Sequence, residues 1–374
     1  MTTWVGARPH GRTSDPSFNK VRKKAVTVHC AECGAYICRG GNREAAPDDC
    51  PMKGEFPEFE NLYPQGQTRD FLVQSALVEA EGYCRWTRVR EVVEFSNRMG
   101  FRRLGLPHCS DMSPISERVA KALSEAGLEP VLPLESSPCD PLAQAGFFAE
   151  AETEMNVLSG MCVGHETLFI QASSAPVVGL VARDTRLKHN PAAGIYTSRS
   201  YLKKELFGHW SPKNRPPFQG WTTETLGRVA EEVKENGKEP RSRLAEAMEF
   251  AHRMGASHLG ISFCVGFRQE AAVLSKLLQT NGFRVSSVCC KTGSTPKEEA
   301  GIQDAQKVRP GTREMICNPL AQAELLNRDQ VEFVMVLGQC VGHDAATFKA
   351  LDAPAICLVA KDRVLAHNSV AALP

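Results

Sequence analysis

The second half of the chain alternates short apolar runs with longer segments of helical spacing. The apolar runs are HLGISFC (258–264), FRVSSVCC (283–290), VEFVMVLGQC (331–340) and PAICLVAKD (354–362). Apolar residues recur at helical intervals in the segments between them, 268–282, 318–327 and 343–353. Strands that are apolar on both faces and separated by helices are typical of a parallel sheet covered on both sides. The pattern therefore predicts a doubly wound α/β domain.

An earlier part of the chain repeats this pattern. Its apolar runs are RLGLPHC (103–109), LEPVLPL (128–134), EMNVLSGMC (154–162) and VVGLVARD (177–184). Residues 91–109 match residues 246–264 at an offset of 155, and two later blocks match at an offset of 178. Three blocks in one order indicate an internal duplication. We expect two tandem copies packed about a pseudo-twofold axis, as a pseudo-dimer within one chain.

The repeats and the composition of the flanking segments predict five parts. They are an N-terminal arm (1–28), a four-cysteine knuckle (29–60), a first α/β repeat (61–202), a linker (203–240) and a second α/β repeat (241–374). The change of offset places 23 extra residues in the second copy, most simply within the polar segment 291–314. We expect that segment to be a loop or a short helix.

In the second copy, Cys264, Cys290 and Cys340 each end a predicted strand, and Cys317 precedes a predicted helix. Ligands of open α/β sheets gather outside the carboxyl ends of the strands, so these four thiols should converge at one edge. Nearby helix N-termini favour thiolates and anionic clusters. The arrangement predicts a four-thiolate metal or iron–sulfur site. The adjacent Cys289 should face the other side of its strand and be structural.

The first copy keeps three of these four cysteines, Cys109, Cys139 and Cys162, and has Glu135 in place of Cys290. The trio could hold a four-iron cluster with one iron free, or with Glu135, water or a substrate as the last ligand. An open position distinguishes catalytic metal sites from closed structural ones. The alternative is a degenerate copy that has lost its metal.

A histidine follows Cys-Val-Gly in each copy, His165 in the first and His343 in the second. Either ring could hydrogen-bond sulfur, transfer protons, or merely cap its helix. At an open site in the first copy, His165 would be the nearest proton donor and Glu135 a candidate base. We therefore expect any catalysis to belong to the first copy.

A third cysteine group precedes both copies. Cys30, Cys33, Cys38 and Cys50 have the spacing C-x2-C-x4-C followed by a fourth thiol after eleven residues. This is a compact four-thiolate knuckle, which suits either zinc or an iron–sulfur cluster. The spacing predicts a metal site without identifying the metal.

Composition and charge narrow the class of function. The 374 residues carry 44 Lys and Arg against 43 Asp and Glu, so no net field attracts nucleic acid or an anionic membrane. No run approaches about 18 consecutive apolar residues, and the N-terminus lacks the apolar core of a signal peptide. A cytoplasmic protein is expected. Fourteen cysteines in a reducing compartment favour metal over disulfides.

With these motifs in place, the chain resembles a family of uncharacterised predicted metal-binding proteins found chiefly in anaerobic bacteria and archaea. The resemblance rests on the knuckle and on the second-copy motifs Cys264, Val-Cys-Cys290-Lys-Thr-Gly, Cys317-Asn-Pro, Cys340-Val-Gly-His343 and Lys361-Asp362-Arg363. It covers residues 29–60 and 241–374. Most family members carry one such unit, so the resemblance implies a fused pseudo-dimer here. The resemblance implies metal and fold and supplies no reaction.

Together these observations predict a cysteine-ligated metalloprotein, most simply an iron–sulfur protein with 4Fe-4S clusters. Its role would be redox, electron-transfer or sulfur-related chemistry of anaerobic metabolism, with a redox partner protein and with zinc as an option at the knuckle. The alternative is a zinc-binding structural or regulatory protein without catalytic activity. The sequence leaves open whether the chain is an enzyme.

Overall fold

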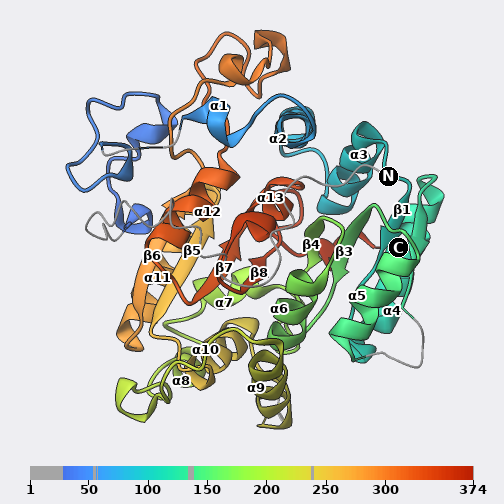
Figure 1. The fold of residues 1–374 in the computed structure, drawn as a ribbon, viewed down its shortest axis with the longest axis vertical. Coiled ribbons are helices and arrows are strands. Elements are labelled where there is room, and N and C mark those ends of the chain that lie inside the picture. The colour runs from blue at the N-terminus through green and yellow to red at the C-terminus, as the bar shows by residue number, and fades with distance from the viewer. Residues whose placement is uncertain (1–27, 54–55, 57, 134–138, 237–239, 374) are drawn as a thin grey trace, which may run out of the picture.

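The chain folds around two four-stranded parallel sheets, one in each repeat (Figure 1). The computed structural model describes residues 28–53, 56, 58–133, 139–236 and 240–373. The first sheet contains β1 (Arg103–Gly105), β2 (Glu129–Val131), β3 (Met155–Ser159) and β4 (Val177–Val181), in the order β2-β1-β3-β4. The second contains β5 (His258–Phe263), β6 (Arg284–Cys289), β7 (Phe333–Leu337) and β8 (Ala355–Val359), in the equivalent order β6-β5-β7-β8. The prediction of a duplicated, doubly wound α/β fold is confirmed.

Helices connect successive strands in both repeats. They are α4 (Ser113–Glu125), α5 (Pro141–Glu150) and α6 (Val163–Ala172) in the first, and α11 (Arg268–Thr280), α12 (Pro319–Arg328) and α13 (His343–Ala350) in the second. The chain reverses its direction of winding between β1 and β3, and again between β5 and β7. Such switch points open a crevice at the carboxyl edge of a sheet, where ligands bind. The cysteines that follow β1, β3, β5 and β7 lie at these two places.

The remaining helices precede the sheets or join the repeats. They are α1 (Phe59–Leu62), α2 (Gln67–Gly82), α3 (Arg88–Met99), α7 (Pro191–Tyr196), α8 (Lys203–Leu206), α9 (Thr223–Asn236) and α10 (Arg243–Arg253). The span 203–240, expected to be a linker, thus holds α8 and α9. Helices α9 and α10 occupy the positions of α2 and α3 at the offset of 155, so the repeated unit includes a helix pair ahead of each sheet.

Each of these helix pairs packs against the opposite repeat. Helix α9 lies on α6 of the first repeat, and α2 lies on α13 of the second. The approach is close because Gly164 and Gly342 face Ala230 and Ser75, respectively, and leave no room for a Cβ atom. The helix pairs are therefore exchanged in the sense that they bridge the two repeats, and α3 also packs on α4 and β4 of its own repeat.

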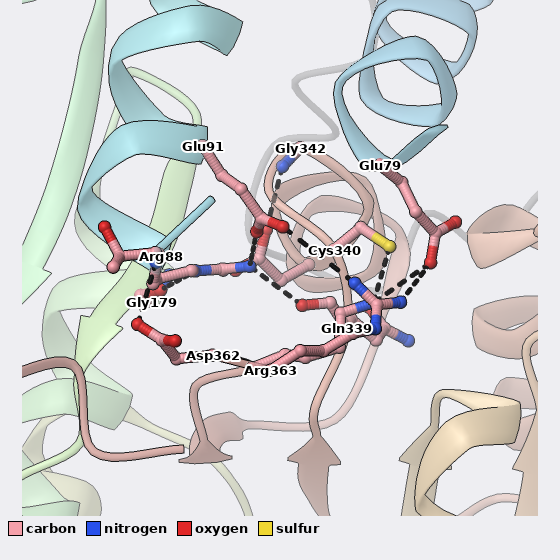
Figure 2. A network of polar contacts seen from close by, with 12 residues as sticks. Glu79, Arg88, Glu91, Gly179, Gln339, Cys340, Gly342, Asp362 and Arg363 are labelled. Atoms are coloured by element: carbon pink, nitrogen blue, oxygen red, sulfur yellow. Dashed lines mark hydrogen bonds and ion pairs between the residues drawn. The ribbon is translucent and has the colours of Figure 1, made fainter. Parts of the chain in front are cut away.

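Two buried arginines mark this exchange. The Arg88 guanidinium donates to Asp344 Oδ2 (2.6 Å) and to the carbonyl oxygens of Gly179 (2.9 Å) and Gln339 (3.0 Å) (Figure 2). The equivalent Arg243 donates to Glu166 Oε2 (2.7 Å) and to the carbonyl oxygens of Cys357 (3.0 Å) and Met161 (3.0 Å). Each arginine thus links both repeats, and equivalent residues make equivalent contacts.

The knuckle is attached to the edge of the second sheet. Residue 29 forms a parallel bridge with Ser287 of β6, and the Ser287 amide donates to the carbonyl oxygen of Val28 (2.6 Å). The start of segment 291–314 also contacts the knuckle, whereas its short 3-10 turns at Lys297–Ala300 and Asp304–Gln306 pack near α1 and α2. Ser294 Oγ in this segment donates to the Cys38 carbonyl oxygen (3.1 Å). Within the described chain, no helix has both the length and the apolar character needed to cross a bilayer.

Candidate metal centres

The four cysteines of the second repeat meet at the carboxyl edge of its sheet. Cys264 and Cys290 directly follow β5 and β6, Cys340 follows β7, and Cys317 precedes the N-terminus of α12. All four are at most 4 % exposed. The sulfurs of Cys290 and Cys317 lie 3.6 Å apart, and thiol hydrogen bonds link Cys264 to Cys290 and Cys317 to Cys340. Four segments distant in sequence thus bring their sulfurs into one buried group.

Two lysines and one backbone amide donate to these sulfurs. Lys361 Nζ lies 2.7 Å from Cys340 Sγ and 3.6 Å from Cys264 Sγ, and Lys291 Nζ lies 3.3 Å from Cys317 Sγ. The Val265 amide donates to Cys290 Sγ (3.2 Å). These donors favour the thiolate, which is the form that binds metal.

The thiol pKa values alternate around the group. The hydrogen bond with Cys290 and the nearby Lys361 ammonium lower the pKa of Cys264 to about 6, although burial opposes the thiolate. The pKa of Cys317 is also lowered, first by its hydrogen bonds with Cys290 and Cys340. The pKa values of Cys290 and Cys340 are raised because each donates to a neighbouring cysteine. Metal ligation requires deprotonated sulfurs, so a cation bound at this group would displace the remaining thiol protons.

The first repeat contributes an acid to this second-repeat centre. Glu79 of α2 accepts from Lys361 Nζ (3.4 Å) and from Arg363 (Figure 2). Burial raises the pKa of Glu79, but the charges of Lys361 and Arg363 outweigh it and lower that pKa below its usual range. His343 is held by the same helix, with Nε2 3.3 Å from the Leu72 carbonyl oxygen. The exchanged helix pair thus fixes both the charge balance and the histidine of the centre.

The first-repeat centre brings together two cysteines and a histidine. The ligand atoms of Cys109, Cys162 and His165 all lie within 4.8 Å of one another. Cys109 Sγ is 3.6 Å from His165 Nδ1 and accepts from the Cys162 amide (3.3 Å). Cys139 shares a thiol hydrogen bond with Cys109, and its sulfur lies 3.2 Å from Ser110 Oγ. The Cys109 hydrogen bond is the main cause that lowers the pKa of Cys139 to about 5.

Residues of the second repeat complete the surroundings of this centre. Glu231 of α9 accepts from His165 Nε2 (3.1 Å), and Glu246 of α10 accepts from the Val163 amide (2.7 Å). Burial opposes a charged His165, but its hydrogen bonds with Cys162 and Glu231 raise its pKa to about 9. Burial and the nearby Cys162 raise the pKa of Glu246 to about 7. Both ring nitrogens of His165 are engaged by protein atoms. Glu135, the candidate base, lies outside the described residues.

The knuckle contains a fifth thiol that sequence reasoning missed. Cys30, Cys33, Cys38, Cys50 and Cys289 line one cavity of about 20 Å³ together with Tyr36, Ile37, Met52 and Thr292. Cys289 hydrogen-bonds Cys38, and burial raises the pKa of Cys30. Its side chain leaves β6 on the face opposite to Cys290, as expected, and is fully buried where the knuckle packs on the core. A purely structural role for Cys289 stays a prediction. The signal in the sequence was that Cys289 and Cys290 are adjacent at the end of a predicted strand, which places their side chains on opposite faces.

Two aspartates near the cysteine edges have local structural roles. Asp184 accepts from the amides of Leu187 (2.8 Å) and Arg243 (2.8 Å), and Asp362 accepts from the amides of Leu365 (2.9 Å) and Arg88 (2.8 Å). They order the loops after β4 and β8 and cap the exchanged helices. The lysine and glutamate partners of the cysteines were also missed by sequence reasoning. The spacing Arg-x-x-Glu, which recurs at 88–91 and 243–246, was one signal for the exchanged pair.

Comparison with known proteins places these centres in a family. The model of the family described as "Protein of unknown function (DUF1847)" matches residues 50–134, 132–180 and 215–358. An uncharacterised protein of Methanocaldococcus jannaschii is 38 % identical over 133 residues, which are 36 % of this chain and 67 % of that protein. A crystal structure of Dph2 from Pyrococcus horikoshii with a 4Fe-4S cluster covers 69 % of this chain and 54 % of its own at 13 % identity. Its TM-score of 0.21 is too low to bear on fold or chemistry. The first two matched stretches fall largely in the first repeat and the third in the second, and the chain belongs to the DUF1847 family.

Proposed function

We propose that this chain is an iron–sulfur protein whose second repeat holds a buried cluster for electron transfer. Cys264, Cys290, Cys317 and Cys340 are the residues that would hold it. A four-thiolate set suits both zinc and iron–sulfur clusters, so the donor set alone does not decide between them.

The observation that carries the proposal is the ring of cationic and amide donors aimed at the sulfurs. Lys361 Nζ lies 2.7 Å from Cys340 Sγ, and Lys291 Nζ lies 3.3 Å from Cys317 Sγ. Hydrogen bonds to cluster sulfurs are one of the principal means by which a protein sets a reduction potential. Buried ammonium groups also offset the negative charge that a four-thiolate cluster carries and that reduction increases. Such adjustment matters most at a redox centre, because its charge changes with every electron that it accepts.

The four-cysteine set leaves no coordination position for a substrate. A cluster bound there would supply one-electron transfer, and the protein's part is to bury it, orient its thiolates and balance its charge. Glu79 offsets part of the cationic charge of Lys361 and Arg363, so the local potential depends on the exchanged helix α2. We expect a redox partner protein, and sulfur-related chemistry is a further role that this site could serve.

The competing proposal is a zinc-binding structural or regulatory protein. Its support is the knuckle, where five thiols surround a cavity of about 20 Å³, a volume suited to a single ion. Closed four-thiolate zinc sites stabilise small folds directly. Zinc at the knuckle is compatible with an iron–sulfur cluster in the second repeat. The two proposals compete only over the metal of the second-repeat site.

Anaerobic purification of the full chain, with iron and acid-labile sulfide analysis, tests the proposal. We expect both elements, a visible absorption band that dithionite bleaches, and an electron paramagnetic resonance signal from the reduced protein. Cys340→Ser should remove or alter that signal, whereas the exposed Cys84→Ser should leave it unchanged. Stoichiometric zinc without acid-labile sulfide would reject the iron–sulfur proposal in favour of its competitor.

A further inference from the structure

The first repeat holds a ligand set that differs in kind from that of the second. We propose that Cys109, Cys139, Cys162 and His165 form a closed site for a single zinc-class ion, with Glu231 of the second repeat positioning the histidine. This inference goes beyond the proposed cluster and does not depend on it. It also replaces an open, catalytic first-repeat site with a closed one.

The spacing of the ligand atoms in the first repeat fits a single ion. Tetrahedral zinc, with bonds of about 2.3 Å to sulfur and about 2.0–2.1 Å to nitrogen, places a sulfur and a nitrogen ligand roughly 3.5 Å apart. Cys109 Sγ and His165 Nδ1 are 3.6 Å apart, and both lie within 4.8 Å of Cys162 Sγ. The first-repeat spacing therefore fits one shared ion. Spacing alone does not distinguish the two repeats, because Cys290 Sγ and Cys317 Sγ of the second repeat are equally close at 3.6 Å. The distinguishing observation is the acid that orients His165.

Cys139 supplies the fourth ligand. Its thiol already hydrogen-bonds Cys109, and this contact is the main cause of its lowered pKa. Asp140 caps helix α5 directly after it, accepting from the amides of Leu142 (3.0 Å) and Ala143 (2.9 Å). Cys139 is only half-buried, whereas Cys109 and Cys162 are buried, so it lies on the solvent side of the group. The proposed site thus has three buried ligands and a fourth, Cys139, nearer the surface, on the side from which an ion would enter.

His165 is oriented as a metal-bound histidine is. Its Nδ1 faces the sulfurs, and its Nε2 lies 3.1 Å from Glu231 Oε1. A carboxylate that accepts from the distal ring nitrogen fixes the tautomer and makes the other nitrogen a stronger ligand. An acid at this position can accept the hydrogen bond of the distal ring nitrogen, whereas Arg or Lys could not. Glu231 therefore has the chemistry expected of the partner of a metal-bound histidine.

Comparison of the two repeats argues against a decayed site. At the offset of 155, the first-repeat residue equivalent to Glu231 is Ala76, and the second-repeat His343 faces the Leu72 carbonyl oxygen instead of a carboxylate. Both repeats have the equivalent histidine, so the acid is specific to the repeat that lacks a fourth buried cysteine. Lys234, on the same helix face, lies 3.5 Å from Glu231 and places a cation near the thiolates of Cys139 and Cys162. A repeat that had lost its metal would not require Glu231 beside the histidine or Lys234 beside the thiols.

The test uses the full chain, its metal content and its cobalt spectrum. We expect Cys109→Ser and Cys139→Ser each to lower the zinc content by one ion per chain, with iron and sulfide unchanged. Cobalt substitution should give tetrahedral d–d and sulfur-to-cobalt bands that these variants lose. Cys139→Ser is included because a half-buried position tolerates the change if Cys109→Ser misfolds. The exposed Cys84→Ser is the matched control and should lose no ion.

Glu231 and His165 separate coordination from mere packing. Glu231→Gln should raise the zinc dissociation constant of this site by about 10–100-fold, whereas Glu224→Gln, an exposed acid on the same helix, should not change it. His165→Cys should keep the ion and strengthen the sulfur-to-cobalt bands. Unchanged zinc content and an unchanged cobalt spectrum in Cys109→Ser and Cys139→Ser would overturn the inference. Loss of iron and sulfide in place of zinc would overturn it as well, whereas their absence from the wild-type chain would reject only the cluster of the second repeat.

Discussion

Arg88 and Arg243 are equivalent residues of the two repeats, and the guanidinium of each binds a carboxylate of the opposite repeat. Arg88 binds Asp344 (2.6 Å), and Arg243 binds Glu166 (2.7 Å). The same carboxylates accept from the amides of Gly179 in β4 and Cys357 in β8. The backbone donors of two edge strands are thereby satisfied without a continuous sheet. This exchange joins the repeats and carries residues of each into the other's metal centre.

Removal of one of these arginines should destabilise the whole chain. Arg88→Met leaves Asp344 buried and without its cation, which should cost about 3–5 kcal/mol in the free energy of unfolding. Urea unfolding measures this cost. Adding Asp344→Asn should recover part of it because the buried charge is removed. Arg228→Met, which breaks an exposed pair with Glu232, should change stability by less than about 0.5 kcal/mol. Equal effects of Arg88→Met and Arg228→Met would contradict the structural role of the exchange.

Lys361 should set the reduction potential of the second-repeat cluster. Lys361→Met removes a donor 2.7 Å from Cys340 Sγ and a buried positive charge, both of which favour the more negative reduced state. A hydrogen bond to a charged group contributes about 1.5–3 kcal/mol, so the potential should fall by on the order of 100 mV. Redox titration followed by electron paramagnetic resonance measures the shift. Replacement of the exposed Lys276 by Met is the control. An equal fall in the reduction potential of that variant would show that Lys361 does not act locally on the cluster.

Cys289 should contribute to metal retention by the knuckle. Its thiol contacts Cys38 inside the cavity of the knuckle, so Cys289→Ser removes a buried sulfur from the ligand group. We expect a chelator to extract the knuckle metal at least about tenfold faster, by comparison with the effect of losing an outer-shell partner. Release is followed with a chromophoric chelator. Cys84→Ser should release metal at the wild-type rate. An unchanged rate in Cys289→Ser would return this residue to a packing role.

Stability should decrease in mild acid because of His258, which lies at the amino end of β5, away from the cysteine edge. Arg284 donates to its Nδ1 (2.6 Å), so the ring is neutral and Nε2 donates to Ser286 Oγ (2.6 Å). Burial and the Arg284 charge lower the pKa of His258, and they outweigh the opposing charge of Asp329. The folded-state pKa lies below the unfolded value of about 6.5. The stabilising contribution is therefore complete above that value and is lost as pH falls toward the folded pKa.

Urea unfolding between about pH 7.5 and pH 5 measures this dependence. His258→Gln should make the free energy of unfolding vary less steeply with pH than in the wild type. The exposed His209→Gln should retain the wild-type slope. A wild-type slope in His258→Gln would assign the pH dependence to other histidines with a lowered pKa, such as the buried His108 or the half-buried His252.

Local patterns were sufficient to predict most of the fold and the convergence of the four second-repeat cysteines. The apolar runs 258–264 and 331–340 predicted β5 and β7 because a strand buried on both faces leaves a continuous apolar signal in the sequence. Cys264, Cys290 and Cys340 could be assigned to one edge because parallel strands end at the same side of a sheet. The duplication was visible because equivalent residues recur in the same order. These features depend on neighbouring residues and on one topological rule.

The periodicity and spacing of the sequence did not predict the side chains that surround the cysteines. Glu79 and Glu231 lie on helices α2 and α9, and each approaches cysteines of the other repeat. Nothing in the residues around Glu231 indicates that its carboxylate lies beside His165. Their contact depends on how the two repeats dock, which is decided by the fit of buried surfaces such as Gly164 on Ala230. The helical pattern of α9 was also masked by its position in a polar segment.

The sequence by itself determined that the chain is a duplicated α/β protein with three groups of cysteines at predictable places. Periodicity and spacing are local, and they survive without knowledge of the contacts between distant segments. Only the tertiary structure decided which acids, lysines and histidines surround each group, and that Cys289 belongs to the knuckle. It did so because side chains 60 or more residues apart, such as His165 and Glu231, come together only when the exchanged helices are packed. Long-range packing thus determines the chemistry of sites whose ligands the sequence already locates.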